Sequence, residues 1–328
     1  MKILVTGGAG FIGTHLTNTL LERYSDLKLE IVDDLSSSSL SKKRREFFER
    51  NRIKFFHQTV EEWQPSGWYD HIYHLACRVG PAHVLKYAGR MAKEIADDTD
   101  KVANLAIRDK APLISISTSE VYGKDPCGIP QHENIPLEVP AVFSIRLEYA
   151  VAKLLNEISL TNLANVEPRL RVNLIRPFNI VGPYQTGEGG FVLPRFVEAA
   201  LLGNPLTVFG DGNQTRSFTH VADLVDSLIK IMESSVNQRI YNVGTPENTC
   251  SIKHLAEQVI SLVGSRSEIS FVDPKEIFGQ LYTEAPSKIP DTSQIQKEIN
   301  WSPRWSLDEI IKDYILFLKK EYPLSSVP

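Results

Sequence analysis

The chain has 328 residues, of which 42% are hydrophobic and 23% are charged, and its formal net charge is −4. This length is enough for a large core, either in one α/β domain or in two lobes. The slightly acidic balance gives no reason to expect nucleic acid or a membrane as a partner, and no apolar run approaches the ~18 residues of a membrane span. Three cysteines without a C-x-x-C spacing indicate neither a disulfide framework nor a metal site, so we expect no metal and a cytoplasmic location.

The first predicted elements are a strand, a tight turn and a helix within residues 2–13, KILVTGGAGFIG. A short apolar run stops at glycines, and a helical pattern then starts. Glycines at this spacing let the chain turn, let the backbone approach a pyrophosphate and let the helix pack close to the strand, while the first N–H groups of the helix hold the phosphates. The residues expected to contact a dinucleotide here are Gly7, Gly10, Phe11, Ile12 and Gly13.

A second strand is predicted at residues 27–32, and it ends at Asp33, which lies 20 residues past Gly13. A carboxylate at this distance is expected to bind the hydroxyls of the adenosine ribose, as in proteins that bind NAD rather than NADP. The next three residues, DLS, include no arginine that would receive a 2′-phosphate. The sequence therefore predicts NAD as the cofactor.

Strands and helices alternate as far as about residue 176, with further strands predicted at 53–57, 69–74, 112–117 and 169–175 and long helices at 84–110 and 142–165. This alternation predicts an α/β fold, a Rossmann-type doubly wound parallel sheet with a smaller C-terminal α/β substrate-binding lobe. Ligands of such sheets bind outside the carboxyl ends of the strands. Two residues after the fourth strand are therefore also expected to contact the cofactor, namely Leu75 and Ala76.

The character of the chain changes after residue 178, where glycine and proline become frequent. We expect residues 1–178 to form the NAD-binding Rossmann domain and residues 213–243 to return to it. Residues 179–328 are expected to form mainly the substrate-binding lobe. A helix predicted in this part begins at Ser251, a favoured N-cap, and ends at Gly264.

Tyr149 and Lys153 are four residues apart, so they share one face of the second long helix. The positive charge of Lys153 favours the phenolate, which would lower the pKa of Tyr149 and make it a usable base. Because Tyr24 and Lys28 have the same spacing, the spacing alone is a weak signal. Thr118 sets the first pair apart, since it ends a central strand and its hydroxyl can share the substrate oxygen. A hydroxyl, a tyrosine and a lysine around a nicotinamide can remove a hydride from a secondary alcohol.

The motifs TGGAGFIG, STSEVYG, Tyr149-x-x-x-Lys153, RPFNIVGP and FGDGNQTRSFTHVAD, in this order, resemble the extended short-chain dehydrogenase/reductase family. The chain is most similar to its nucleotide-sugar epimerases, dehydratases and decarboxylases, over residues 1 to about 305. The resemblance implies that Tyr149 takes the proton of the sugar 4-hydroxyl while Thr118 steadies that oxygen, and that the C4 hydride passes to NAD⁺. Lys153 would bind the nicotinamide ribose. The common intermediate would be a 4-keto sugar.

The resemblance also implies where a nucleotide-diphosphate sugar and a second subunit bind. Asn179 is expected to contact the diphosphate or the adjacent sugar, and Arg216 the diphosphate, because a guanidinium fork suits paired oxygens. Arg78 lies in a segment that departs from the family pattern, and we expect it to reshape the sugar pocket. The two long predicted helices form a dimer interface in many relatives, so we expect a homodimer. The apolar residues considered for this interface, or alternatively for packing on the sheet, are Val102, Leu105 and Ala106.

Glu120 is the residue that discriminates between reactions of the 4-keto sugar. A carboxylate there can take the acidified C5 proton, as a 4,6-dehydratase requires, whereas a 4-epimerase has no need of it; alternatively Glu120 is structural. Thr118-Ser119-Glu120 resembles the Thr-Ser-Glu of GDP-mannose dehydratases and UDP-glucuronate decarboxylases, and Ser119 replaces the acid of dTDP-glucose dehydratases. Decarboxylases pair this Glu with a late Arg, where this chain has Lys288.

The sequence therefore predicts an NAD-dependent nucleotide-sugar epimerase/dehydratase of the 4,6-dehydratase or 4-epimerase type. The alternatives are a UDP-glucuronate decarboxylase-like enzyme, a net 4-dehydrogenase of a nucleotide sugar and, from a different class, a non-catalytic NAD-binding sensor. The residues expected to take part in catalysis are Thr118, Ser119, Glu120, Tyr149 and Lys153.

Overall fold

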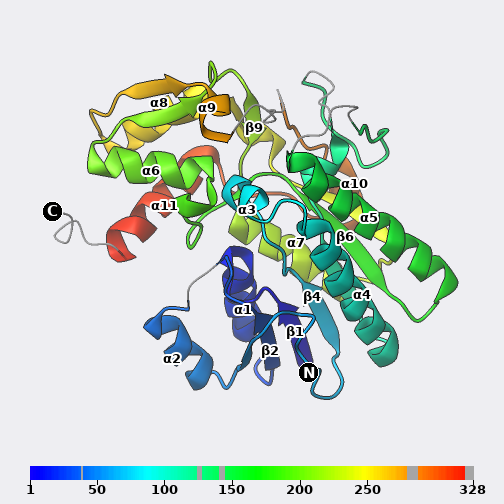
Figure 1. Ribbon diagram of the computed structural model, residues 1–328. Coiled ribbons are helices and arrows are strands. Elements are labelled where there is room, and N and C mark those ends of the chain that lie inside the picture. The colour runs from blue at the N-terminus through cyan, green and yellow to red at the C-terminus, as the bar shows by residue number, and fades with distance from the viewer. Residues whose placement is uncertain (38–39, 124–127, 140–144, 279–286, 322–328) are drawn as a thin grey trace.

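The computed structural model describes residues 1–37, 40–123, 128–139, 145–278 and 287–321 (Figure 1). Its centre is a seven-stranded sheet built from β1 (Lys2–Thr6), β2 (Lys28–Asp33), β3 (Lys54–His57), β4 (His71–His74), β5 (Leu113–Ile116), β6 (Val172–Pro177) and β11 (Arg239–Val243). The strand order is β11-β6-β5-β4-β1-β2-β3, and every neighbouring pair is parallel. The chain changes direction across the sheet between β1 and β4. This confirms the doubly wound parallel sheet.

Helices cover both faces of this sheet, which explains why its strands are apolar on both sides. One face packs against α1 (Phe11–Arg23), α2 (Lys42–Arg50), α7 (Val221–Glu233) and α10 (Ser293–Ile299), and the other against α4 (Met91–Asp109) and α5 (Ile145–Val166) (Figure 1). Successive residues of β1 alternate between the two cores, since Ile3 and Val5 belong to the first and Leu4 to the second. All three are fully buried.

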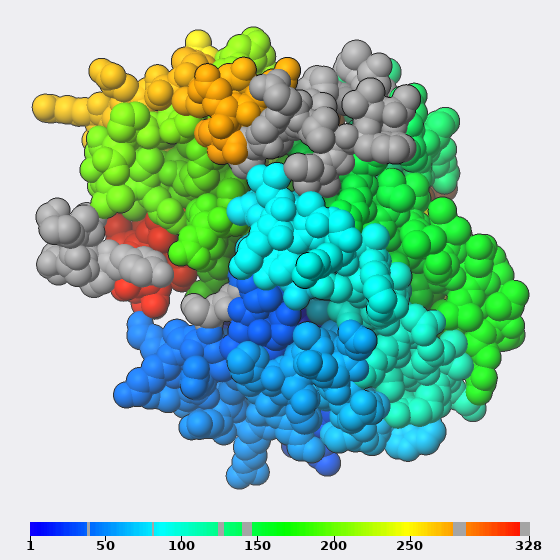
Figure 2. Space-filling view, in the orientation of Figure 1, coloured from blue at the N-terminus to red at the C-terminus, as the bar shows by residue number. Residues whose placement is uncertain are grey.

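The single helix expected at residues 84–110 is two helices in the structure, so that expectation is wrong in its start and its continuity. A short helix α3 (Pro81–Lys86) is followed by a turn, and α4 begins only at Met91. The turn contains Gly89 with a φ of +83°, a left-handed conformation that a helix does not accommodate. Figure 2 shows this segment, in cyan, between the blue N-terminal part of the chain and the green and orange second lobe.

The second lobe has a core of its own, formed by α6 (Val192–Leu202), α8 (Ile252–Val263) and α11 (Leu307–Glu321) with β8 (Leu206–Phe209) and β13 (Ile269–Val272). Ser251 caps α8 by accepting a hydrogen bond from His254 N, and Gly264 ends the helix with a φ of +72°. Both predicted caps are confirmed. The remaining elements are short: β7 (Ile180–Val181), β9 (Thr215–Ser217), β10 (Thr219–His220), β12 (Thr249–Ser251) and α9 (Pro274–Phe278).

A late segment returns to the sheet, which the sequence did not suggest. Ile295 of α10 and Trp301 are buried in the same core as α1 and α7. The Trp301 indole N–H donates to the carbonyl of Asp223, at 3.2 Å. Residues 293–301 therefore belong to the packing of the sheet.

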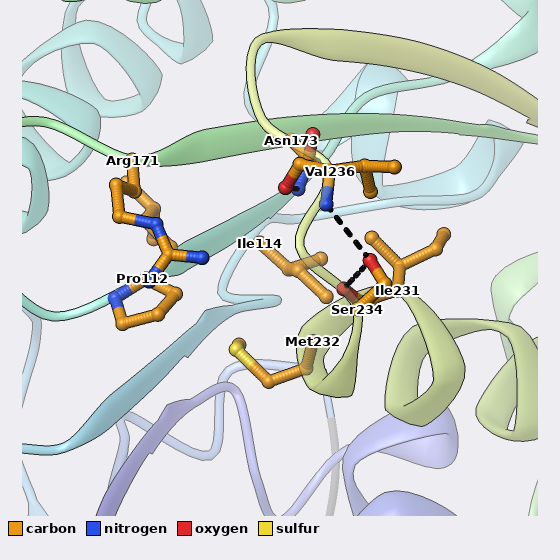
Figure 3. Close-up of a pocket in the computed structure, with 9 residues that line it drawn as sticks. Pro112, Ile114, Arg171, Asn173, Ile231, Met232, Ser234 and Val236 are labelled. Carbon is orange, nitrogen blue, oxygen red and sulfur yellow. Dashed lines mark hydrogen bonds between the residues drawn. The ribbon is translucent and has the colours of Figure 1, made fainter. Parts of the chain in front are cut away.

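A small pocket lies at the edge of the sheet formed by the amino ends of β5 and β6 (Figure 3). Pro112 and Arg171 precede these strands, and the end of α7 closes the pocket through Met232 and Ser234. Ser234 is already engaged, since its hydroxyl donates to Ile231 O and accepts from Val236 N. The pocket is thus at the edge opposite the predicted site.

No helix in the described part of the chain is long and apolar enough to cross a membrane.

Candidate active site

The glycine turn after β1 is built for close approach of backbone to backbone. Gly7 has a φ of +72°, and a Cβ there would lie 2.7 Å from Ala76 N. A Cβ on Gly13 would lie 2.2 Å from Gly7 O. No described side chain caps the N-terminus of α1, where Gly10 is the N-cap. The first N–H groups of the helix, in Phe11 and Ile12, therefore suit the phosphates of a dinucleotide.

Gly13→Ala is expected to destabilise the protein by about 1–3 kcal/mol and to weaken NAD binding by about tenfold or more, because the backbone of the turn must move to admit the methyl group. Thermal unfolding and titration with NAD measure the two effects. Gly10→Ala is the matched control for folding, since Gly10 has an allowed φ of −71° and its added Cβ meets Gly7 O at 3.4 Å. An unchanged melting temperature in Gly13→Ala would contradict the packing seen here.

Asp33 lies beside this turn at the carboxyl end of β2. Its Oδ2 accepts a hydrogen bond from Ala9 N and its Oδ1 one from Leu35 N, both at 2.9 Å. Burial raises the pKa of Asp33, while these hydrogen bonds act in the opposite direction. The structure thus brings the expected ribose ligand next to the expected phosphate site. Leu75 and Ala76 complete this edge after β4, and Leu75 N donates to Thr6 O.

Arg78 lies on the same side of the site as Asp33. Its Nη2 is 3.3 Å from Asp34 Oδ2, its Nη1 pairs with Glu94, and its guanidinium is 4.3 Å from the ring centre of Tyr87. These contacts place Arg78 next to the residue that follows Asp33. They join the segment before α3 to the loop after β2, and the expected effect of Arg78 on the sugar pocket stays a prediction.

Thr118, Tyr149 and Lys153 meet as expected. Tyr149 on α5 is hydrogen-bonded to the side chain of Thr118, which follows β5. Lys153 Nζ donates to Ile116 O at 2.8 Å and is hydrogen-bonded to the thiol of Cys77. All three predicted residues are buried. The end of β5 and one face of α5 therefore form a compact phenol, hydroxyl and ammonium group.

The expected lowering of the Tyr149 pKa by Lys153 is wrong for this structure. Burial raises the pKa of Tyr149 well above its ordinary value, and the nearby Cys77 and Glu120 raise it further. The hydrogen bond with Thr118 lowers it, but to a smaller extent. The physical reason is that a phenolate would be desolvated here, while the ammonium of Lys153 is directed to Ile116 O and Cys77.

Glu120 is held between two cations. Its Oε1 is 2.8 Å from Arg146 Nη2, and the same oxygen pairs with Lys288 Nζ. Burial alone would raise the pKa of Glu120, but the charges of Arg146 and Lys288 lower it overall. Burial lowers the pKa of Lys288 to about 8; Arg146 and Arg216 act in the same direction, and Glu120 opposes them. Positive charge is therefore concentrated next to the hydroxyl and phenol.

The other predicted substrate residues lie close to this group. Arg216 is buried on β9 with its Nη1 2.7 Å from Thr215 O, and the backbone N–H of Lys288 donates to the same carbonyl. Asn179 follows β6 with a φ of +38°, and its Nδ2 donates to Ser217 O at 3.3 Å. A further predicted residue, Ser119, is buried in the short 3₁₀ helix that also carries Glu120.

Two residues near the reacting groups were not found from the sequence. Arg146 precedes Tyr149 by three residues, so it shares a helix face with it, and this spacing was the available signal. Cys77 directly follows Ala76, and its partnership with Lys153 becomes visible only when β4 is placed beside α5. A third cysteine, Cys127, lies outside the described residues.

Comparisons with known proteins agree with this geometry. The model of the NAD dependent epimerase/dehydratase family matches residues 3–244. The chain is 32% identical to a UDP-N-acetyl-alpha-D-glucosaminuronate decarboxylase of Bacillus cytotoxicus, over 97% of this chain and 98% of that protein. It is also 32% identical to UDP-glucuronic acid decarboxylase 1 of Xenopus tropicalis, over 98% of this chain and 72% of that protein.

A solved structure shows the same architecture. The UDP-glucose 4-epimerase of Thermotoga maritima, determined with UDP-glucose, superposes with a TM-score of 0.84 at 26% identity, covering 98% of this chain and 99% of that one. The geometry of the glycine turn beside Asp33 is compatible with a bound dinucleotide, and that of the Thr118–Tyr149–Lys153 group with hydride removal from an alcohol. The chain therefore belongs to the NAD-dependent epimerase/dehydratase family of nucleotide-sugar enzymes.

Proposed function

We propose that this enzyme removes CO₂ from a UDP-hexuronate by way of a 4-keto sugar. The observation that supports this best is the pair of cations, Arg146 and Lys288, that meets at Glu120 beside the Thr118–Tyr149 group. A sugar carboxylate needs cationic partners when it leaves water, whereas a neutral sugar does not. The names of the two relatives, both decarboxylases of UDP-linked uronic acids, favour the same substrate class.

The reacting groups of this chain can carry out the proton transfers at the 4-hydroxyl. NAD, when bound, supplies the hydride acceptor and donor for C4. Tyr149, in its phenolate form, accepts the proton of the 4-hydroxyl and later returns it, and Thr118 holds that oxygen through its own hydroxyl. A C4 ketone makes the C6 carboxylate part of a β-keto acid. The C5–C6 bond then breaks, its electron pair forms the enolate, CO₂ leaves, and C5 takes a proton from solvent.

A mass-spectrometric assay with NAD⁺ and a panel of UDP-, GDP- and dTDP-sugars tests the proposal. Loss of CO₂ from UDP-glucuronate or UDP-N-acetylglucosaminuronate is the expected result. Loss of water would instead indicate a 4,6-dehydratase, and a new chromatographic peak of unchanged mass a 4-epimerase. Loss of two hydrogens would indicate a net dehydrogenase. Lys288→Gln is expected to lower kcat/KM for UDP-glucuronate by about tenfold or more, because a cation that would bind the sugar carboxylate is removed.

The 4,6-dehydratase is the second candidate. Glu120 follows Thr118 by two residues, and its backbone N–H donates to the Thr118 hydroxyl at 3.2 Å, so its carboxylate lies near the hydroxyl proposed to hold the C4 oxygen. Its two cationic partners keep Glu120 ionised, which a base requires, but they also hold its oxygen. Glu120→Gln separates the two reactions, since a dehydratase loses its base.

A homodimer remains the expected assembly, but the residues first considered for its interface pack elsewhere. These residues are buried against the sheet within one chain, namely Val102, Leu105 and Ala106. On α5, by contrast, Val151, Leu155 and Ile158 are 40%, 48% and 51% exposed and share one helix face. We propose that this apolar face binds a second copy of the chain.

Leu155→Glu is expected to convert the dimer into a monomer, because it would bury a charge in the apolar interface. Sedimentation velocity measures the change. Leu202→Glu is the matched control, since Leu202 is 49% exposed at the end of α6 and outside the proposed face. A wild-type chain that sediments as a monomer at micromolar concentration would refute the dimer without affecting the chemistry.

Two further expectations stay proposals. We propose that residues 1–178 and 213–243 hold the cofactor and that residues 179–328 hold mainly the nucleotide sugar, which the separate core of α6, α8 and α11 supports. The cytoplasmic location expected from cysteine usage also stays a prediction, to be tested by cell fractionation.

A further inference from the structure

The side chains that meet at Glu120 differ in depth. Within the described residues, Glu120 contacts Arg146 and Lys288, and Arg216 lies near enough to lower the pKa of Lys288. The side chain of Lys288 is only 5% exposed, whereas that of Glu120 is 26% exposed. The cation is thus deep in the protein, and its carboxylate partner lies nearer the surface.

A buried ammonium needs an anionic partner, because its desolvation is otherwise costly. Glu120 supplies that partner from the 3₁₀ helix Ser119–Tyr122, which begins at the Thr118 of the reacting group. A hexuronate carries the same chemical group as the glutamate side chain, a carboxylate with two oxygens and one negative charge. Two carboxylates are not expected to share Arg146 and Lys288 at close range, since like charges repel.

We propose that Arg146 and Lys288 form a carboxylate subsite which Glu120 occupies until the carboxylate of a hexuronate displaces it; this inference rests on the proposed function. Glu120 is then an internal competitor. It keeps the two cations paired when no substrate is present, and it withdraws when the acidic sugar binds. Arg146 is a specificity-determining residue, since it favours acidic over neutral sugars.

Binding measurements in a Tyr149→Phe background test the competition without turnover. Glu120→Gln is expected to bind UDP-glucuronate about tenfold more tightly, because a neutral amide holds the two cations less strongly than a carboxylate. The affinities for UDP-glucose and for UDP should stay the same, which also shows that the variant is folded. Equal or weaker binding of UDP-glucuronate, or equal tightening for all three ligands, would overturn the proposal.

Arg146→Gln is expected to weaken the binding of UDP-glucuronate by about tenfold or more and to leave UDP-glucose unchanged. Arg169→Gln is the matched control, since Arg169 pairs with Glu167 at the surface. An equal loss for both sugars would assign Arg146 to the diphosphate and overturn its role in specificity. Should Glu120→Gln fail to fold, Glu120→Asp, whose carboxylate is shorter by one methylene, is expected to change UDP-glucuronate binding in the same direction.

The same ligands distinguish failure of this inference from failure of the proposed function. If Glu120→Gln binds only UDP-glucuronate more tightly, but the enzyme with its native Tyr149 releases no CO₂, the carboxylate subsite stands and the decarboxylase is rejected. If the enzyme with its native Tyr149 releases CO₂, but Glu120→Gln does not bind UDP-glucuronate more tightly, the decarboxylase stands and the competition between Glu120 and the substrate carboxylate is rejected.

Discussion

Tyr149→Phe is expected to lower kcat by about 10²- to 10⁴-fold, the usual contribution of a positioned acid–base group. The phenol is buried and hydrogen-bonded to Thr118, so its removal deletes the group that exchanges a proton with the 4-hydroxyl. The ring itself stays, and the binding of NAD and of the nucleotide sugar should be retained. Formation of NADH in a single turnover and binding of both ligands are the measurements.

The chain contains a matched control for this substitution. Tyr24 has the same spacing to Lys28 that Tyr149 has to Lys153, yet its hydroxyl pairs with Glu233. Tyr24→Phe is therefore expected to keep full activity. Wild-type kcat in Tyr149→Phe would refute the assignment of Tyr149 as the acid–base group.

The pH dependence of the wild type follows from the same environment. Burial raises the pKa of Tyr149 above its ordinary value, so the phenol keeps its proton at neutral pH in this structure. Only the phenolate accepts a proton from the 4-hydroxyl. The rate of C4 oxidation is therefore expected to rise with pH up to the pKa that Tyr149 has in the complex, and this rise should be absent in Tyr149→Phe.

The parts of the site that the sequence predicts are those in which local pattern determines position. A strand followed by closely spaced glycines leaves few conformations for the chain, and the carboxyl ends of parallel strands meet at one edge of the sheet. Gly13, Asp33 and Thr118 were found in this way. Tyr149 and Lys153 were found because a helix brings residues four apart onto one face.

The rest of the site depends on contacts between segments that are distant in the sequence. Lys288 meets Glu120 across 168 residues of sequence; the resemblance to decarboxylases pointed to this pairing, but no local pattern in the APSKIPD segment that contains Lys288 indicates it. The hydrophobic pattern of α4 and α5 likewise predicts which helix faces are apolar, but it does not predict whether a face packs against the sheet or lies at the surface. Val102 faces the sheet and Leu155 the surface, although both are apolar helix residues. Local sequence does not distinguish a core face from a subunit interface.

A buried ion pair behind Thr118 is expected to dominate local stability. Arg176 on β6 and Glu157 on α5 are each 3% exposed, with 2.5 Å between Arg176 Nη2 and Glu157 Oε2. Burial lowers the pKa of Arg176, but its bonds with Glu157 raise it overall. Ser117, the residue before Thr118, donates its hydroxyl to the same carboxylate. The pair thus ties α5 to the strand ends that hold the reacting groups.

Glu157→Ala is expected to reduce the free energy of unfolding by about 3–5 kcal/mol, because it leaves the guanidinium of Arg176 buried without its partner. Urea denaturation measures the loss. Glu167→Ala breaks an exposed pair with Arg169, where water screens the charges, and should change the free energy of unfolding far less. Glu157→Leu combined with Arg176→Met removes both charges and should recover most of the loss, since the penalty comes from the unpaired charge and not from the absence of an ion pair. A cost in Glu157→Ala no larger than that in Glu167→Ala would show that water reaches Arg176.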